Sequence, residues 1–143
     1  MSESSEVRTH LGIDPRWSGR VLRVAPGACE VELVLLDEMA ADASGLVHGG
    51  FVFSAADHCA MCTVNHPNVV LARSELRFLR PSRVGTTLRF AGRIVEPSDR
   101  RPVVHVEASD AQGIVFEGQF HCAIPARHVL SATLPAGSDG VGP

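Results

Sequence analysis

Two features of the sequence are suited to chemistry, and they lie eight residues apart. Residues 45–50 read Gly-Leu-Val-His-Gly-Gly and directly precede a long apolar stretch, within which Asp57 is the one acid. Free N–H groups at a helix start, with the positive end of the helix dipole, hold negative charge. A carbonyl oxygen that becomes an oxyanion needs such donors. The pair therefore indicates two parts of a hydrolytic site.

The apolar stretch, residues 49–64, is too long for a usual strand and predicts a helix of ~24 Å. A helix that is apolar all round is buried, and a buried carboxylate needs a partner or a task. An Asp57 that merely faces solvent or caps a strand is the weaker interpretation. Its neighbours Ala55, Ala56, Cys59 and Ala60 offer no polar stripe for it to join.

Gly49 and Asp57 are separated by ~12 Å along such a helix, at 1.5 Å per residue. They cannot both reach one small group from the same helix. The sequence therefore suggests that Asp57 of one subunit meets Gly49 of another across a two-fold axis.

Alternating apolar and polar residues predict strands on both sides of this helix. The expected inward residues include Val70, Ala72, Leu76 and Phe78, and further along Ile114, Phe116 and Phe120. The order is two strands, one buried helix and then four strands, which suggests a single antiparallel sheet wrapped around the helix. The expected strands cover residues 20–24, 29–36, 69–80, 86–95, 103–109 and 114–124.

The length of 143 residues fits one domain, which we expect to be folded over about residues 11–128. The first residues are expected to be loose or to form a short helix, and the tail from about Ser131 to be mobile. The net charge of −3 gives no field for nucleic acid, and the polar, acidic N-terminus is not a signal peptide. No apolar run spans a bilayer, so we expect a cytoplasmic protein with reduced cysteines. All thirteen basic residues are Arg, whose planar fork suits a phosphorylated ligand, although codon preference explains the bias equally well.

Residues 45–57 resemble the Gly-x-x-His-Gly-Gly motif and the following Ala-Asp helix of the PaaI-like acyl-CoA thioesterases, a hotdog-fold family. A second match is Phe-Leu-Arg-Pro at residues 78–81, with Gly85 following. The resemblance covers about residues 19–125. It implies an α+β hotdog fold, with five to six antiparallel strands around the central helix, and hydrolysis of acyl-CoA by a homodimer or a dimer of dimers. It implies no metal and no cofactor beyond the coenzyme A of the substrate.

The resemblance also implies roles for individual residues. The Gly49 N–H, next to Gly50, would polarise the thioester carbonyl, and Asp57 of the partner subunit would be the general base or the nucleophile. His48 would orient the substrate or support the loop. Arg80 would lie near the coenzyme A channel.

Two positions depart from the family pattern or match it only loosely. Asp42 stands where relatives often carry an Asn that positions water or carbonyl, and a second carboxylate there could raise a pKa or repel anions. Ser74 is the nearest candidate for an assisting hydroxyl on the following strand. Phe51, Phe53, Met61 and Phe78 suit either an acyl pocket or the core.

Other classes of site and function fit less well. His58, Cys62 and His66 recur every four residues and, with Cys59, could suggest zinc, but structural zinc sites usually draw ligands from two elements. Cys59 and Cys62 lie mid-helix and make a poor redox pair. The main rival is a non-catalytic acyl-CoA-binding module, such as a ligand sensor. A hydratase ranks lowest, because His58 would point ~100° away from Asp57 around the helix.

Overall fold

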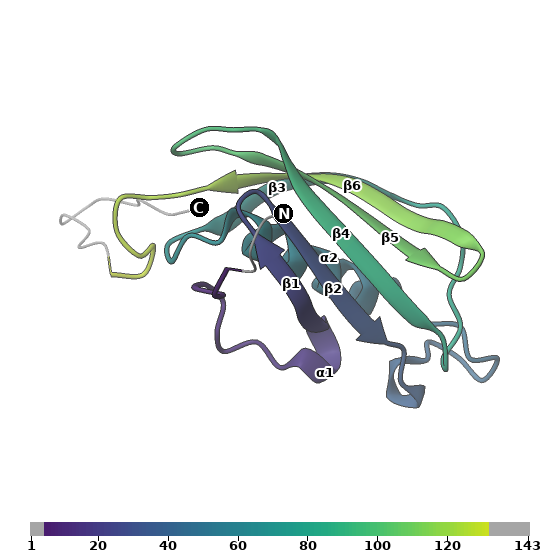
Figure 1. Ribbon diagram of the computed structural model, residues 1–143. Coiled ribbons are helices and arrows are strands. Elements are labelled where there is room, and N and C mark those ends of the chain that lie inside the picture. Colours follow the sequence, from purple (N-terminus) through teal and green to yellow (C-terminus); the bar gives the residue numbers. More distant parts are fainter. Residues whose placement is uncertain (1–4, 132–143) are drawn as a thin grey trace, which may run out of the picture.

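The computed structural model describes residues 5–131. Within them, six strands form one antiparallel sheet in the order β1-β2-β4-β5-β6-β3, which curves over the long helix α2 (Figure 1). The α+β hotdog prediction, a sheet of five to six strands around a buried helix, is confirmed. The strands are β1 (Arg20–Ala25), β2 (Ala28–Val34), β3 (Val70–Phe78), β4 (Thr87–Glu96), β5 (Val103–Asp110) and β6 (Gly113–Ala123).

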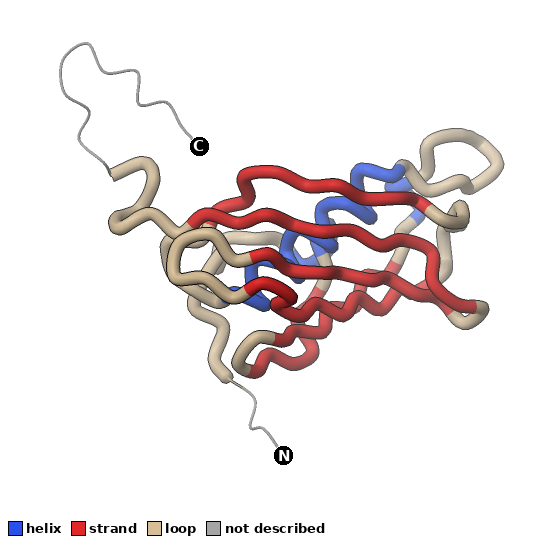
Figure 2. Tube along the Cα trace, turned by 90° about the horizontal axis from the view of Figure 1, so that it is seen from above, coloured by secondary structure: helices blue, strands red, loops and turns tan. Residues whose placement is uncertain are grey.

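Helix α2 (Gly49–Val64) has the predicted bounds and lies along the concave face of the sheet (Figure 2). It begins after His48, whose backbone is extended, and it ends at Asn65 in the left-handed region. Residues on all its sides are buried, from Val52 to Thr63. The helix packs tightly against β4 at Gly92, where an added Cβ would collide with the Thr63 hydroxyl. The core therefore fixes the helix against the sheet.

A bulge in β3 changes which of its residues face inward, compared with the prediction. The pairing of β3 with β6 shifts between Leu71 and Arg73, so Leu71, rather than Val70 or Ala72, lies opposite the buried Cys122. Ala72 is exposed. Alternation then resumes as predicted: Ser74, Leu76 and Phe78 share the inner face. Their β6 partners are Phe120, Gly118 and Phe116.

A second bulge corrects β6. Between Ala108 and Ser109 of β5, the partner on β6 changes from Phe116 to Ile114, which leaves Val115 as an extra residue. Val115 and Phe116 are both buried, whereas Ile114 is 43% exposed. The strict period of two that predicted Ile114 as an inward residue fails because a bulge inserts one residue.

The short helix α1 (Pro15–Ser18) was not predicted, and it packs on α2 through a bond between the Ser18 and Ser54 hydroxyls, 2.6 Å apart. The predicted mobile tail falls almost wholly on residues 132–143, outside the described part of the chain. Among residues 5–131, no helix has both the length and the apolar character needed to cross a membrane.

Candidate active site

The start of α2 is held in place by the loop that precedes it. The His48 N–H donates to the Met39 carbonyl at 3.0 Å, and the Val47 N–H donates to the Ser82 carbonyl at 2.9 Å. Gly45, with φ +86°, adopts a backbone conformation that L side chains rarely take. Within residues 5–131, no acceptor takes the N–H of Gly49 or Gly50. These two amides are therefore free donors at the positive end of the helix.

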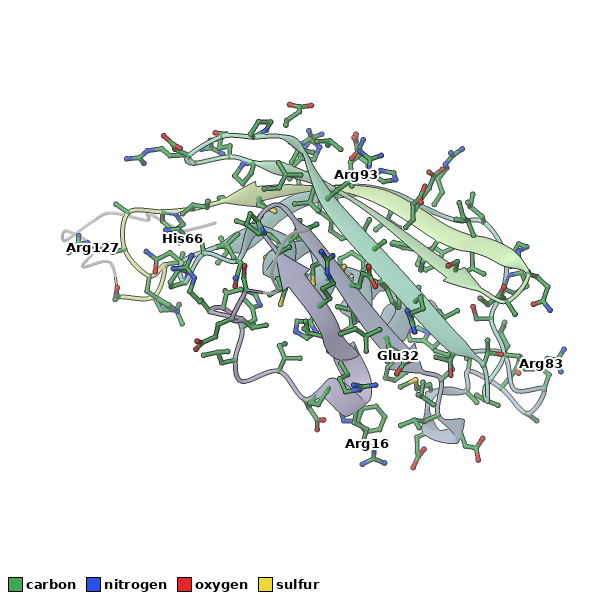
Figure 3. All side chains as sticks on the ribbon, viewed as in Figure 1. Arg16, Glu32, His66, Arg83, Arg93 and Arg127 are labelled. Carbon is green, nitrogen blue, oxygen red and sulfur yellow. The ribbon has the colours of Figure 1, made fainter. Side chains whose placement is uncertain are left out.

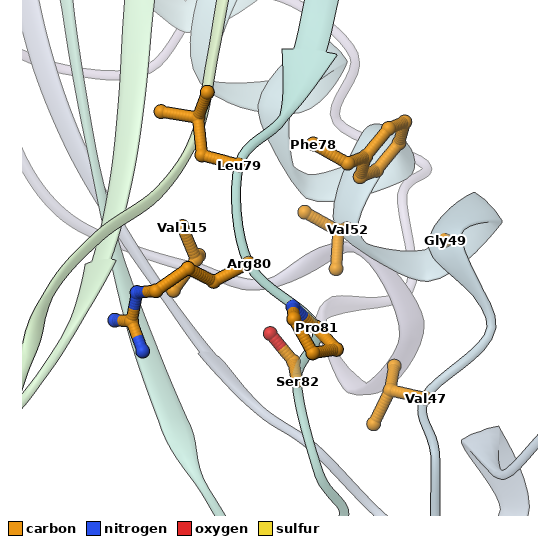
Figure 4. A pocket seen from close by; sticks show the side chains of 9 residues that line it. All are labelled: Val47, Gly49, Val52, Phe78, Leu79, Arg80, Pro81, Ser82 and Val115. Atoms are coloured by element: carbon orange, nitrogen blue, oxygen red, sulfur yellow. The ribbon is translucent and has the colours of Figure 1, made fainter.

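A pocket of about 300 Å³ opens beside Gly49 (Figure 4). Gly49 forms part of its wall, and a Cβ at this position would lie 3.3 Å from the Phe78 ring. The wall is otherwise largely apolar. Its lining residues are Val47, Gly49, Val52, Phe78, Leu79, Arg80, Pro81, Ser82 and Val115. Of the four residues proposed for an acyl pocket, Phe78 lines this one, whereas Met61 is fully buried core.

Asp57 is half-buried on α2, and its Oδ1 atom is buried without a hydrogen-bond partner within residues 5–131. Burial raises the pKa of this carboxyl above its ordinary value, while the charges of His10 and His58 act in the opposite direction. A carboxylate left unsatisfied in this way is unfavourable for stability. Its arrangement suits a group that meets a further partner or accepts a proton.

His10 lies close enough to Asp57 for its charge to act on the carboxyl, and no pattern in the sequence indicates this proximity. His10 has φ +52°, an uncommon conformation for a residue other than glycine, and its Nε2 lies 3.1 Å from the Val69 carbonyl. The segment before it is bound to the C-terminus of α2: the Arg8 N–H donates to Asn65 Oδ1 at 2.8 Å. The first ten residues were expected to be loose or to form a short helix, and no glycine or asparagine marks the left-handed position, so the sequence carries no signal for this arrangement.

His48 lies beside the free amides. Its imidazole is in van der Waals range of Gly50, where an added Cβ would meet the ring at 3.0 Å, and it packs edge-on against Phe51. Within the described chain its side chain makes no hydrogen bond, so its backbone N–H is what ties it to the loop. The imidazole is exposed and available to a ligand.

Asp42 is engaged in a local turn. Its Oδ1 accepts from the Ser44 N–H at 2.9 Å and from the Ser44 hydroxyl at 2.6 Å, and these bonds lower the pKa of the exposed Asp42 carboxyl. It makes no contribution to the shifted pKa of Asp57 in the same chain. Within one chain, Asp42 and Asp57 therefore do not form the pair of neighbouring carboxylates that the sequence suggested.

Ser74 and Arg80 flank Phe78 along the chain: Ser74 lies on β3, and Arg80 follows just after the end of this strand. Ser74 is half-buried on the inner face of β3, opposite Phe120. Arg80 lines the pocket with its stem, but its guanidinium donates to Asp110 Oδ1 at 2.7 Å and to the Gly113 carbonyl at 3.2 Å. Figure 4 shows this side chain pointing away from Gly49. The ion pair also lowers the pKa of Asp110.

The conceivable zinc ligands on α2 are directed to separate partners. His58 Nδ1 bonds to the Ser18 carbonyl at 3.0 Å, and His66 Nδ1 accepts from the Asn68 N–H at 3.0 Å. The four cysteines are buried and free, and the pKa values of Cys29 and Cys62 are strongly raised. Such thiols are poor ligands and poor nucleophiles at neutral pH.

The site thus consists of two separate parts on one helix. The free amides and the pocket lie at the start of α2, while the half-buried Asp57 carboxylate lies eight residues further on. Strand β3, beside both, is an edge of the sheet. An edge strand presents unpaired N–H and C=O groups to another chain.

Comparisons with known proteins agree with this geometry. A family model described as the thioesterase superfamily matches residues 44–117. The crystal structure of an uncharacterized protein from Pyrococcus horikoshii is 40% identical, with a TM-score of 0.88 over 90% of this chain and 99% of that one. The E. coli PaaI protein, 20% identical over 78% of this chain and 83% of its own, has a TM-score of 0.70 and shows the fold alone.

Two curated relatives contain a similar segment. Methylthioribose-1-phosphate isomerase from Aquifex aeolicus (strain VF5) is 47% identical over 115 residues, which are 80% of this chain and 25% of that protein. Transcription factor FapR from Shouchella clausii is 30% identical over 77 residues, which are 54% of this chain and 40% of its own. The chain therefore spans only a quarter and two fifths of these relatives.

Proposed function

Since the chain belongs to the thioesterase superfamily, we propose that it hydrolyses an acyl-CoA thioester to the free acid and coenzyme A. One observation carries this proposal. The helix start, with its free Gly49 amide, lies at a largely apolar pocket, and the same helix carries a half-buried carboxylate whose Oδ1 has no hydrogen-bond partner within residues 5–131. A thioester needs a donor for its carbonyl oxygen and a group that activates water, and these two features provide both.

In the proposed reaction, the thioester carbonyl oxygen accepts from the Gly49 N–H. Water attacks the carbonyl carbon while Asp57 takes its proton, and the helix start stabilises the oxyanion that forms. When the C–S bond breaks, the proton returns from Asp57 to the leaving sulfur. Burial raises the pKa of Asp57 and so strengthens it as a base. Direct attack by the carboxylate, giving a mixed anhydride that water then hydrolyses, is the alternative role for Asp57. Neither route requires a metal.

The two groups come together if β3 pairs with β3 of a second copy. Gly49 lies beside Phe78. The charge of Asp57 acts on Cys122, which pairs with Leu71, so Asp57 lies toward the other end of β3. Antiparallel pairing about Leu76 would set Phe78 of one copy opposite Ser74 of the other. Gly49 of one copy would then lie beside the half of β3 that is next to Asp57 in the second copy.

Charges on the outer face of β3 are compatible with this register and disfavour the two adjacent ones. Pairing about Leu76 sets Glu75 opposite Arg77 of the second copy, and the two-fold axis repeats the pair. A shift of the axis to residue 75 or 77 would instead set like charges opposite each other. We expect Glu75→Arg to weaken the dimer and the double variant Glu75→Arg/Arg77→Glu to restore it, as measured by analytical ultracentrifugation. Equal dissociation constants for all three proteins would contradict the register.

The test of the reaction is thiol release from a panel of acyl-CoAs, detected with a thiol-reactive chromophore. Asp57→Asn keeps the shape of the side chain and removes the base. We expect this variant to lose at least ~10²-fold in kcat, the lower range for general base catalysis. Hydrolysis by the variant as fast as by the parent would exclude Asp57 as base or nucleophile.

A second candidate is a non-catalytic module that binds acyl-CoA. The similarity to a segment of a protein named as a transcription factor favours it, whereas a pure binder has no need of an unpaired carboxylate. Binding of acyl-CoA without any thiol release from the parent protein would support the module and overturn the hydrolase.

A further inference from the structure

The pocket at Gly49 lies next to a second pocket. Both are lined by Pro81 and Ser82, and the second, of about 180 Å³, ends at Arg83 beside Ser44 and Leu46. A molecule whose reactive carbonyl lies at Gly49 could thus extend along residues 81–83, from the first pocket to the second.

This path has a fixed wall. The Val47 N–H donates to the Ser82 carbonyl, and the Val84 N–H donates to the Gly45 carbonyl, each at 2.9 Å. Between these bonds, Leu46 and Arg83 form an isolated β-bridge. The Arg83 backbone is therefore tied to the same loop that positions the helix start, about 10 Å from Gly49 at ~3.3 Å per extended residue.

Arg83 is the guanidinium on this path that is free to bind a ligand. It is exposed, and no carboxylate within residues 5–131 lies within ion-pair distance of it. Figure 3 shows it projecting at the end of the molecule opposite His66 and Arg127. Arg80, by contrast, is neutralised by Asp110. The nearby Asp42 is bound by Ser44.

We infer that Arg83 binds a phosphate group of the coenzyme A moiety. This inference rests on the proposed function. Its planar fork of donors matches phosphate oxygens. The pantetheine arm would run along Pro81 and Ser82, with the thioester at Gly49. Arg83 then supplies affinity for the carrier and takes no part in the chemical step, in place of the role expected for Arg80.

The test compares one acyl group on two carriers, coenzyme A and N-acetylcysteamine, which has no phosphate. For Arg83→Gln we expect KM for the acyl-CoA to rise about tenfold, as the loss of a charged hydrogen bond implies, with kcat unchanged. For the short thioester kcat/KM should stay the same. Arg93→Gln, an equal charge change on the outer face of β4, should alter neither.

Two further results separate this inference from the proposed function. Equal effects of Arg83→Gln on both carriers, or none on either, would overturn the phosphate role although hydrolysis stands. If the parent hydrolyses neither substrate, the proposed function fails. Calorimetry with free coenzyme A then decides the inference: it stands if Arg83→Gln weakens binding about tenfold relative to Arg93→Gln, and it falls if the two variants bind equally or the parent does not bind.

Discussion

The backbone donor at Gly49 can be removed by a single substitution. Gly49 is the first residue of α2, a position at which proline is favoured, because its N–H has no partner within the helix. His48 before it has ψ 129°, the extended backbone that a following proline requires. Gly49→Pro therefore deletes the proposed oxyanion donor with little change to the helix.

The matched control is Gly49→Ala. Its Cβ lies 3.3 Å from the Phe78 ring, as a proline Cβ would, and Phe78 is 53% exposed and so has room to shift. Alanine keeps the N–H. The difference between the two variants thus isolates the donor, and loss of one oxyanion donor lowers kcat by ~10²–10³.

The assay is steady-state thiol release from the best acyl-CoA substrate, with circular dichroism melting curves for both variants. We expect Gly49→Ala to lie within about tenfold of the parent, and Gly49→Pro to fall by ~10²–10³ relative to Gly49→Ala, which is ~2.7–4 kcal/mol of transition-state stabilisation. Equal kcat values for the two folded variants would refute Gly49 as the oxyanion donor.

Three further predictions follow from described contacts. Because burial raises the folded-state pKa of Asp57, the stability that this carboxyl contributes is fully present below its ordinary pKa of 3.8 and is lost as pH rises through the folded value. In thermal melts, Asp57→Asn should therefore unfold at a higher temperature than the parent at pH 7, and this gain should vanish below pH 3. The charge of His10 lowers the pKa of Asp57, and asparagine tolerates the left-handed backbone of His10. His10→Asn should therefore move the acidic limb of the kcat/KM profile against pH to higher pH. An unmoved limb would exclude this coupling. Gly92→Ala forces a Cβ against Thr63 and should lower the free energy of unfolding by about 1–3 kcal/mol in urea, whereas Gly12→Ala, with nothing within 4 Å, should change it little.

The sequence was informative wherever one local pattern decided the structure. The bounds of α2 follow from a continuous apolar run between Gly49 and the break at His66, and the inner face of β4 follows from Leu88 and Phe90. The predicted alternation of inward and outward residues is wrong at Ala72 of β3 and at Val115 of β6, because each strand has a bulge there. A bulge depends on the partner strand. No property of the strand's own residues marks it.

The site was predictable in part for the same reason. A lone acid on an apolar helix marks Asp57 as a candidate from sequence, and in the structure this residue is half-buried with no hydrogen-bond partner for Oδ1 within residues 5–131. The carboxylate that occupies Arg80 lies 30 residues away at the β5–β6 turn, and the Val69 carbonyl that holds His10 lies 59 residues away. Such long-range pairs follow from the topology, which the local pattern does not specify.

The central claim is that each site combines Gly49 of one subunit with Asp57 of another, and subunit complementation tests it most directly. Gly49→Pro and Asp57→Asn chains are refolded together, and thiol release is compared with each variant alone. A mixed dimer holds one intact site, so random pairing predicts about a quarter of the parental activity. Activity no higher than that of the separate variants, in a preparation where mixed dimers are detected by mass spectrometry, would contradict a shared site.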